Sequence, residues 1–294
     1  MRYVQLRAFH NVAVHGGFSR AADALFLTQP AISDQVRKLE EEYDVLLFNR
    51  QKKQVVLTPA GELLLAITRR LFDSEQQALE LLSENRSLRS GTLRIVADSA
   101  HHLLHILALF RAKYPGVRIA VRAGNSQSVV DALFSYEADI GVLGEIPAGQ
   151  NFEFVQLNST PITAFVAATH WLAQNQGLNL AELADLPLVL RERGSKTRTK
   201  LEEAFKAAGF ELVPTIEAEG REAVREIVAS GAGIGFVSMA EFGHDMRLVA
   251  IPIRHARPMT MDEALVCLRE RKNGNLVKAF FDIARQTAGT AKDR

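Results

Sequence analysis

The side chains that could carry out covalent chemistry are few and scattered. Cys267 is the only cysteine among 294 residues, and it lies in a strand-like run with no histidine beside it in the sequence. We therefore expect its thiol to pack in a hydrophobic core and not to act as a nucleophile. A single cysteine also excludes a disulfide framework and a thiolate metal site.

Three neighbouring histidines invite a metal-site interpretation. His101 and His105 would share one face of a predicted helix, with His102 between them in the sequence. No carboxylate lies within a turn on that face, so we expect no metal ion. The run "GAGIG" at 231–235 lacks the spacing of a dinucleotide-binding fingerprint, and no set of residues combines an acid, a base and a nucleophile. The sequence therefore predicts neither an enzyme nor a bound cofactor.

Binding of a small anion fits the residues better. Four predicted turns place short polar or cationic side chains at helix starts, where free N–H groups attract anions. Lys196 and Arg221 add positive charge, which favours a doubly charged anion, and Asp98 could face an ammonium group. For any single Ser or Asn, plain helix capping is the alternative. The expected effector-binding residues are Asp98, Ser99, Asn125, Ser126, Ser195, Lys196, Thr197 and Arg221.

The elements that would position these turns alternate between strand and helix from Gly91 onward. "TLRIVA", "VRIAVRAG" and "DIGVLG" have strand character, with helical runs between them. A second set runs from "ITAFVAA" through "PLVLRE", "TIEAEG" and "IGFVS", and "EALVCLRE" then leads back to a final helix. This alternation predicts an α/β fold with parallel layers. The chain would cross between two lobes, lobe I at about 91–161 and 267–294 and lobe II at about 162–266.

The first 58 residues predict a helix–turn–helix. Ser19 can cap a short helix through "RAADAL", and Thr28 can cap a second helix that has Pro30 in its first turn. The second helix has one apolar stripe, formed by Ile32, Val36, Leu39 and Tyr43. Its opposite face is polar and basic, which suits base edges near the helix start and phosphates further along. A merely solvated helix face is the alternative.

A basic hairpin follows the second helix. "VLLF" and "QVVL" flank a cationic tip, which predicts a β-hairpin wing. Eight Lys and Arg stand against six acids through residue 58, and the bases cluster on the second helix and the wing, away from Glu40–Glu42. The expected DNA-binding residues are Gln29, Pro30, Ser33, Asp34, Arg37, Lys38, Arg50, Lys52 and Lys53.

A long helix is predicted from Thr58 to Leu88. Its apolar residues recur with the heptad spacing of a two-stranded coiled coil, which predicts a dimer; packing against its own domain is the alternative. The expected dimerisation residues are Leu64, Ile67, Leu71 and Leu81.

Composition sets the class of protein. The chain is 47% hydrophobic and 23% charged, which is typical of a globular protein with two or three cores. A net charge of +1 argues against a nonspecific polyanion binder, but a small DNA-reading module beside a larger neutral domain is compatible with it. Residues 1–25 contain no basic patch followed by an apolar run, and apolar runs are too short to span a bilayer. We therefore expect a cytoplasmic protein without a membrane partner.

The run "FSRAADALFLTQPAISDQVRKLEEEYDVLLFNR" with "LTPAGELLL" resembles the winged helix–turn–helix of LysR-type transcriptional regulators, and the resemblance extends to about Arg271. It implies a DNA-binding domain at 1–58, a linker helix at 59–90 and a periplasmic-binding-protein-like effector domain at 91–294. It also implies promoter DNA, a small effector and RNA polymerase as partners of a homodimer or homotetramer.

Individual positions carry the resemblance. The family's reading-helix positions are matched by Gln29, Pro30, Ser33 and Arg37, and its wing arginine is matched by Arg50. Two positions depart from the pattern. Asp34 stands where a basic or small polar residue is usual, and Asp44 stands where glycine usually ends the helix. Asp44 can still adopt the left-handed cap conformation.

The effector domain resembles one subgroup of the family more closely. "LRSGTLRIVADS" and "GNSQSVVDALFSYEADI" look most like regulators associated with 2-aminoethylphosphonate catabolism. "GSKTR" is similar to the family's Gly-Ser-x-Thr-Arg element, and Arg221 stands where Ser or Thr is more usual. This resemblance implies 2-aminoethylphosphonate as effector, with an aromatic or amino carboxylate as the rival. The alternative function is a ligand-binding or catalytic α/β protein whose N-terminal helices only mediate dimerisation.

Overall fold

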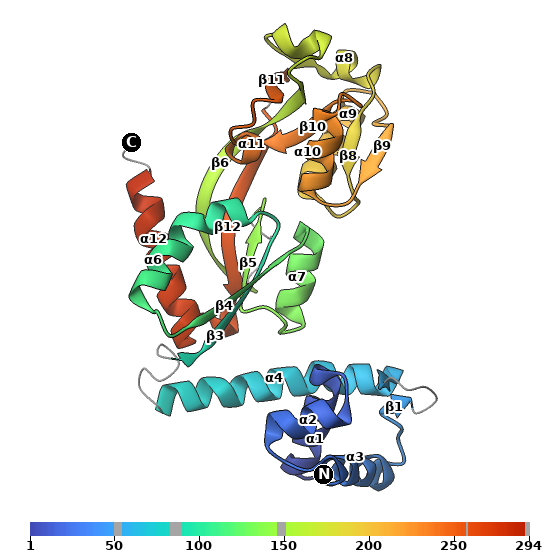
Figure 1. The fold of residues 1–294 in the computed structure, drawn as a ribbon, viewed down its shortest axis with the longest axis vertical. Helices are drawn as coiled ribbons and strands as arrows, with labels where there is room; N and C mark the ends of the chain where they lie inside the picture. Colours follow the sequence, from blue (N-terminus) through green and yellow to red (C-terminus); the bar gives the residue numbers. More distant parts are fainter. Residues whose placement is uncertain (50–54, 83–89, 146–150, 257, 292–294) are drawn as a thin grey trace. The chain divides into compact units, whose positions relative to one another are not determined.

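The computed structural model describes residues 1–49, 55–82, 90–145, 151–256 and 258–291. The chain forms two compact units, Met1–Ser83 and Glu84–Arg294, and each is described by itself (Figure 1). Within the described ranges, no helix is both long enough and apolar enough to cross a membrane.

The first unit is a helix–turn–helix with a hairpin and a long helix. Its elements are α1 (Tyr3–His15), α2 (Phe18–Leu25), α3 (Gln29–Tyr43), the antiparallel strands β1 (Phe48–Asn49) and β2 (Val56–Leu57), and α4 (Pro59–Leu82). One apolar core joins them, in which Phe9, Val12 and Val36 are fully buried. The expected helix pair and hairpin are therefore present.

Two expectations for this unit were wrong in detail. Ser19 does not cap α2, because Gly16 ends α1 in the left-handed conformation and α2 begins at Phe18, after Gly17. The early start brings the ring of Phe18 to 5.7 Å from that of Phe48 in the core. Tyr43 is 52% exposed and is not part of the buried stripe of α3, because that helix ends at Tyr43.

Lobe I of the second unit is a sheet covered on both faces. Its parallel strands are β3 (Thr92–Ala97), β4 (Arg118–Ala123) and β5 (Ile140–Leu143), in the order β4-β3-β5. On one face, η1 (Ala100–Leu103), α6 (Leu104–Lys113) and the final helix α12 (Asn275–Ala291) share a core. On the other face lies α7 (Ser126–Phe134), as Figure 1 also shows.

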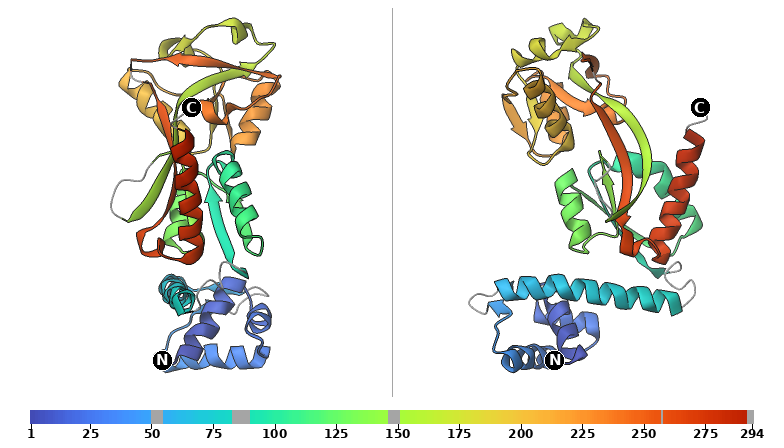
Figure 2. Two further views of the ribbon diagram at one scale, coloured as in Figure 1. Left: turned by 90° about the vertical axis from the view of Figure 1, so that its left-hand side faces the viewer. Right: turned by 180° about the vertical axis from the view of Figure 1, so that it is seen from behind.

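Two long strands connect the lobes. β12 (Thr260–Leu268) pairs along its length with residues 152–161 of β6 (Phe152–Ala167), and the two form an antiparallel ribbon that is curved in Figure 2. β12 also pairs with β5 of lobe I, whereas β6 continues into lobe II and pairs there with β10 (Gly235–Ser238) and β11 (Leu248–Arg254). The expected parallel layering is therefore incomplete: the crossing strands are antiparallel, because the chain leaves lobe I and returns to it.

Lobe II places strand ends and helix starts opposite those of lobe I. The parallel strands β8 (Val189–Arg191) and β9 (Ile216–Ala218) each precede a helix, α9 (Lys196–Ala207) and α10 (Arg221–Ala229). The remaining elements are η2 (Trp171–Gln174), β7 (Leu178–Asn179), α8 (Leu180–Ala184), α11 (Met239–Phe242) and, at the end of β12, η3 (Arg269–Arg271).

Candidate functional site

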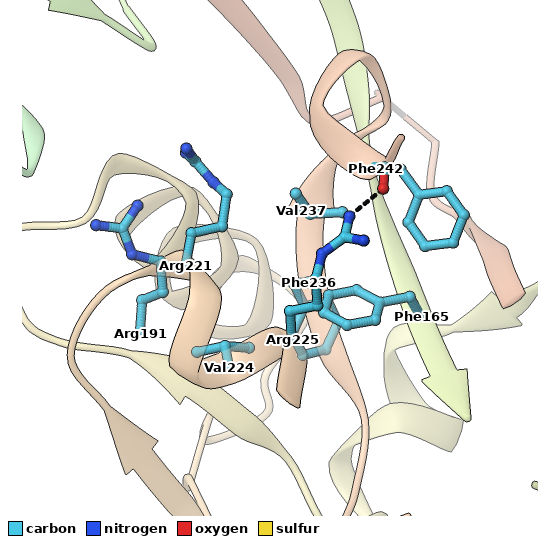
Figure 3. A pocket seen from close by; sticks show the side chains of 8 residues that line it. All are labelled: Phe165, Arg191, Arg221, Val224, Arg225, Phe236, Val237 and Phe242. Atoms are coloured by element: carbon cyan, nitrogen blue, oxygen red, sulfur yellow. Dashed lines mark hydrogen bonds between the residues drawn. The ribbon is translucent and has the colours of Figure 1, made fainter. Parts of the chain in front are cut away.

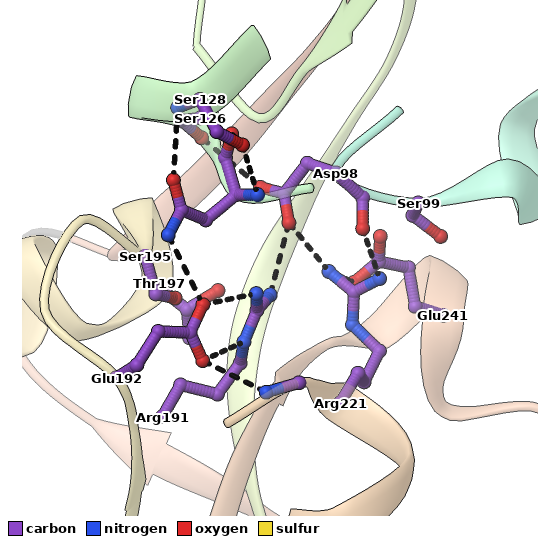
Figure 4. A network of polar contacts seen from close by, with 12 residues as sticks. Asp98, Ser99, Ser126, Ser128, Arg191, Glu192, Ser195, Thr197, Arg221 and Glu241 are labelled. Carbon is purple, nitrogen blue, oxygen red and sulfur yellow. Dashed lines mark hydrogen bonds and ion pairs between the residues drawn. The ribbon is translucent and has the colours of Figure 1, made fainter. Parts of the chain in front are cut away.

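Four strand ends meet between the two lobes. β3 is followed by Asp98 and β8 by Glu192, whereas Asn125 follows β4 after Gly124 and Arg221 follows β9 after a short turn. Figure 4 shows these turns as one network of polar contacts. The structure therefore brings together the turns that were selected from the sequence.

Asp98 is the centre of this network. Its Oδ1 lies 2.9 Å from Arg191 Nη1, and its Oδ2 accepts a hydrogen bond of 3.0 Å from Ser126 Oγ. Arg221 Nη1 donates to the backbone oxygen of Asp98 at 3.0 Å, and its Nη2 lies 3.5 Å from Oδ1. One carboxylate of lobe I thus holds two guanidinium groups of lobe II, where the sequence predicted an ammonium group as the partner.

Arg191 is a member of the site that the sequence patterns did not single out. It ends the buried strand β8 and is only 7% exposed, with Glu192 Oε1 at 2.7 Å as its second partner. Burial opposes its charge, but Asp98 and Glu192 outweigh burial and raise the guanidinium pKa. An arginine within the apolar run "PLVLRE" was the available signal, because a charge in a buried strand requires a partner.

Glu192 and Asn125 form a second link between the lobes. Asn125 caps α7 through a bond from Ser128 N at 3.0 Å, so the plain capping role is confirmed for this residue. Its Nδ2 also donates to Glu192 Oε1 at 3.4 Å. The close approach depends on Gly194, whose φ is +92° and whose position would bring a Cβ within 3.2 Å of the Asn125 amide. Glu192 further accepts from Gly220 N at 2.9 Å, which holds the start of α10.

Three further predicted effector residues already have partners within the protein. Ser99 caps η1, since its Oγ lies 3.4 Å from His101 N. Lys196 pairs with Glu145. Thr197 is buried, and its Oγ1 lies 3.9 Å from the sulfur of Met261. They therefore contribute no free cation to the site.

Ser195 at the start of α9 differs from these residues. It is fully buried, and its Oγ has no hydrogen-bond partner within the described part of the chain. A buried hydroxyl without a partner is uncommon in native proteins, and this one stands beside the α9 N-terminus. Ser195 therefore retains a donor that no described residue uses.

A hollow lies beside this network in lobe II (Figure 3). Arg191 and Arg221 belong to both features, and Arg225 reaches the backbone oxygen of Phe242 across the hollow. The other lining residues are apolar: Phe165, Val224, Phe236, Val237 and Phe242. The two central guanidinium groups thus stand between a polar network and an apolar surface.

The predicted reading helix α3 exposes its polar face. Gln29, Pro30, Arg37 and Lys38 are exposed, and Ser33 is half-buried. The predicted wing-tip residues Arg50, Lys52 and Lys53 lie outside the described residues.

Asp34 is neutralised within α3 itself. Its Oδ1 lies 2.7 Å from Arg37 Nη2 and its Oδ2 lies 2.6 Å from Lys38 Nζ, and these bonds lower the pKa of Asp34. Arg37 Nη1 also pairs with Glu41 Oε1 at 2.9 Å. All these groups are solvent-exposed, so their pairing is weak and can be exchanged for other partners.

The acidic end of α3 has a structural task that was not predicted from the sequence. Glu40 is buried, and its Oε1 accepts hydrogen bonds from Leu47 N at 2.8 Å and Phe48 N at 3.2 Å. These bonds fasten the first strand of the hairpin to α3. Asp44 ends the helix in the left-handed conformation, with φ 48°, which confirms that prediction. Part of the acidic charge near the basic face of α3 therefore stabilises the fold.

Comparisons with known proteins match both units. The LysR substrate binding domain matches residues 86–289, and the bacterial regulatory helix-turn-helix protein, lysR family, matches residues 3–62. The chain belongs to the LysR family. It is a DNA-binding transcriptional regulator, and its named relatives are regulators and not enzymes.

Named relatives and solved structures match this LysR-type regulator over most of its length. A RuBisCO operon transcriptional regulator of Allochromatium vinosum is 35% identical over 80% of this chain and 78% of its own. The HTH-type transcriptional activator CmpR of Synechocystis is 29% identical over the same shares. A full-length OxyR variant from Pseudomonas aeruginosa has a TM-score of 0.79 at 22% identity, covering 97% of this chain and 95% of its own. Full-length CbnR with its target DNA has a TM-score of 0.68 at 21% identity, covering 98% of this chain and all of its own. The two structures support the same two-part fold.

The linker helix of this LysR-type regulator carries an exposed apolar stripe. Leu63, Ile67 and Leu71 lie one turn apart and are 72%, 52% and 41% exposed. Leu64, by contrast, is half-buried and packs against the core of its own unit, as the alternative interpretation of this helix expected. The side chain of Leu81 lies outside the described residues. The seam that we propose for the dimer is therefore centred on Leu63, Ile67 and Leu71.

The LysR-type regulator keeps Cys267 in the core of lobe I. The residue is fully buried, and burial raises the pKa of its thiol to about 12. The thiolate is the reactive form, so we expect no labelling of the native protein by a disulfide reagent at pH 8 over hours. Full labelling in denaturant is the control. Stoichiometric labelling of the native protein within minutes would contradict the buried position.

The neighbouring histidines of the regulator occupy different environments. His101 and His105 are exposed, whereas the imidazole of His102 is buried between Glu241 and Glu263. Burial lowers the pKa of His102, but the two neighbouring carboxylates, Glu241 and Glu263, outweigh burial and raise it to about 9. The sequence offered no carboxylate within one helical turn, and the carboxylates come instead from two distant segments.

Proposed function

We propose that this LysR-type regulator responds to a small anion that binds between the two lobes and replaces Asp98 as the partner of Arg191 and Arg221. The observation that carries the proposal is the pair of guanidinium groups held by one carboxylate across the lobes. An anionic ligand with two or more charged oxygens offers the same acceptors.

The charges of the network favour an anion that displaces Asp98 over one that binds beside it. Two arginines face three carboxylates, those of Asp98, Glu192 and Glu241, with Arg221 Nη2 2.9 Å from Glu241 Oε2. An anion that merely joined this set would meet uncompensated negative charge. An anion that replaced Asp98 would keep both arginines paired, and the free hydroxyl of Ser195 and the helix start beside it would serve as additional donors.

Release of Asp98 would change how the lobes are held. Asp98 belongs to lobe I and both arginines belong to lobe II, so their ion pairs help to hold the two lobes together. A ligand that binds one arrangement better than another shifts the population between them. Such a shift, passed to the DNA-binding units of an oligomer, would alter promoter occupancy or the engagement of RNA polymerase.

The named relatives suggest the class of target gene. Because relatives of Allochromatium vinosum and Acidithiobacillus ferrooxidans are named RuBisCO operon regulators, we propose a carbon-fixation operon as the target. The relatives named here carry no phosphonate assignment, so 2-aminoethylphosphonate is one candidate anion to be tested beside others.

Calorimetric titration of the full-length protein tests the anion site. Inorganic phosphate, 2-aminoethylphosphonate and succinate serve as probes. Arg221→Gln should weaken binding of the preferred probe about 10- to 100-fold, because a charge-assisted bond contributes about 1.5 to 3 kcal/mol. Arg254→Gln, at an exposed arginine of lobe II, is the matched control and should leave the affinity unchanged.

Asp98→Asn decides between two roles of the carboxylate. If Asp98 competes with the anion, the amide should raise the affinity for phosphate by at least about tenfold. If Asp98 instead binds an ammonium group, the amide should weaken 2-aminoethylphosphonate selectively. No binding of any probe by the wild type, with an operator fragment still bound, would refute the anion site and leave the family assignment intact.

A further inference from the structure

One histidine and two glutamates from three separate elements meet near the crossing strands. His102 belongs to η1, Glu241 to α11 and Glu263 to β12. His102 Nε2 lies 3.0 Å from Glu241 Oε1 and 3.5 Å from Glu263 Oε1. Each of the three side chains is only 1% exposed. Three potential metal ligands thus converge in a space that bulk water does not reach.

The spacing of these atoms suits a small divalent ion. Ligand atoms about 2.0–2.1 Å from a tetrahedral ion lie about 3.3 Å from one another. The two distances from His102 Nε2 lie on either side of that value, and one atom from each of the three groups falls within 4.8 Å of the others. An ion therefore requires only small movements of the carboxylates.

The buried oxygens leave room for a further partner. Glu263 Oε1 accepts no hydrogen bond from any residue that the structure describes. Glu241 divides its two oxygens, since Oε1 faces His102 and Oε2 lies 2.9 Å from Arg221 Nη2. Glu241 can therefore bind an ion through Oε1 while it keeps its pair with Arg221.

The balance of charge also favours a dication. Four carboxylates belong to the connected set: Asp98, Glu192, Glu241 and Glu263. The arginines Arg191 and Arg221 supply two positive charges. With all four carboxylates ionised, a proton on His102 leaves one negative charge unbalanced in this largely buried set, and burial accordingly raises the pKa of Glu263. A divalent ion on the neutral imidazole balances the set completely, and unbalanced buried charge is costly.

Asn158 on β6 supplies an outer partner for the imidazole. Its amide lies 3.1 Å from His102 Nδ1, and Asn158 Oδ1 has no hydrogen-bond partner among the described residues. The oxygen and nitrogen of an amide are nearly identical in shape, so a half-turn of the group brings Oδ1 to Nδ1–H. Metal-bound histidines almost always donate their other N–H in this way. The same turn removes the orphaned oxygen.

We propose that His102, Glu241 and Glu263 bind one divalent transition-metal ion and that Asn158 orients the imidazole. One nitrogen and two oxygens suit Zn²⁺ or Co²⁺, whereas Mg²⁺ prefers oxygen ligands and retains several waters. The ion fastens η1 of lobe I to α11 and β12, next to Arg221. The site does not depend on which anion the regulator senses.

Metal titration of the full-length, tag-free protein tests the site. After chelator treatment, Zn²⁺ is titrated in competition with a chromophoric chelator, and Co²⁺ is followed by its visible absorption. The wild type should bind one equivalent of Zn²⁺ per chain. Its Co²⁺ complex should have the visible absorption typical of a low coordination number, and Mg²⁺ should not compete for the site. His102→Gln and Glu263→Gln should each weaken Zn²⁺ binding by more than about 100-fold.

Two further variants make the result specific. His101→Gln changes the adjacent, exposed histidine and should bind Zn²⁺ as the wild type does. Asn158→Ala leaves all three ligands in place and should weaken binding by about 10- to 100-fold. Absence of Zn²⁺ binding by the wild type, or equal binding by His102→Gln and the wild type, would overturn the proposal. Unchanged Zn²⁺ affinity in Asn158→Ala would overturn the orienting role, and if the ligand variants fail to fold, a wild type that binds no Zn²⁺ would still overturn the site.

Discussion

Replacement of both Ile67 and Leu71 by glutamate is expected to convert the dimer that we propose into a monomer. These side chains are 52% and 41% exposed on α4 within one chain, and the proposed partner helix would cover them. Four glutamates per dimer would then lie in an apolar seam, at a cost of several kcal/mol. We expect the dimer dissociation constant to rise at least about 1000-fold. Light scattering at low micromolar protein concentration measures the change.

A substitution away from the seam controls for added charge. Val213→Glu changes an exposed apolar residue of lobe II and should leave the mass in solution unchanged. Retention of the dimer in the Ile67→Glu, Leu71→Glu protein would place the subunit contact elsewhere. Loss of the dimer in the Val213→Glu protein as well would point to general destabilisation and not to a seam on α4.

Replacement of Arg37 by alanine should weaken promoter DNA binding strongly. The guanidinium is exposed on α3, and its ion-pair partners within the described ranges are the exposed carboxylates of Asp34 and Glu41, which phosphate groups can replace. The substitution removes one phosphate-binding cation from each of two subunits, so the slope of log K against log salt should fall by about two. We expect the affinity to decrease about 10- to 100-fold at 0.15 M salt, measured by fluorescence anisotropy with an operator fragment.

The control for this substitution removes the same charge elsewhere. Lys113→Ala, at an exposed residue of α6 in the effector domain, should change neither the affinity nor the salt slope. An unchanged slope in the Arg37→Ala protein would show that α3 does not present this residue to the backbone of DNA. A fall in affinity with an unchanged slope would indicate a contact with base edges instead.

Interactions between residues close together in the sequence made much of the DNA-binding unit predictable. The α3 helix was expected because Thr28 and Pro30 mark its start and its apolar residues recur with helical spacing, and Asp44 was expected to end it in the left-handed conformation. The start of α2 was misplaced, because the position of Phe18 is decided by its packing against Phe48, thirty residues along the chain. The role of Glu40 was not predictable for the same reason, since its hydrogen-bond partners belong to a later segment.

The effector domain shows which features local sequence patterns do not predict. Strand and helix runs, and the polar turns between them, follow from residue type and spacing, so Asp98, Asn125, Ser195 and Arg221 could be selected from the sequence. The sequence alone could not say that Asp98 neutralises the arginines, because the ion pairs join residues about a hundred positions apart. The net charge of a site is the sum of the charges of the residues that surround it in space, and the fold decides which residues these are.

The sequence by itself determined the family, the order of the elements and the exposed basic face of α3, because these depend on periodicity, capping and turn chemistry within a few residues. Only the tertiary structure decided that Arg191 and Arg221 share one carboxylate. It also decided that His102, and not His101 or His105, meets two glutamates. The physical reason is that burial and pairing arise when β6 and β12 bring distant segments together, and no local pattern records which partner will be there.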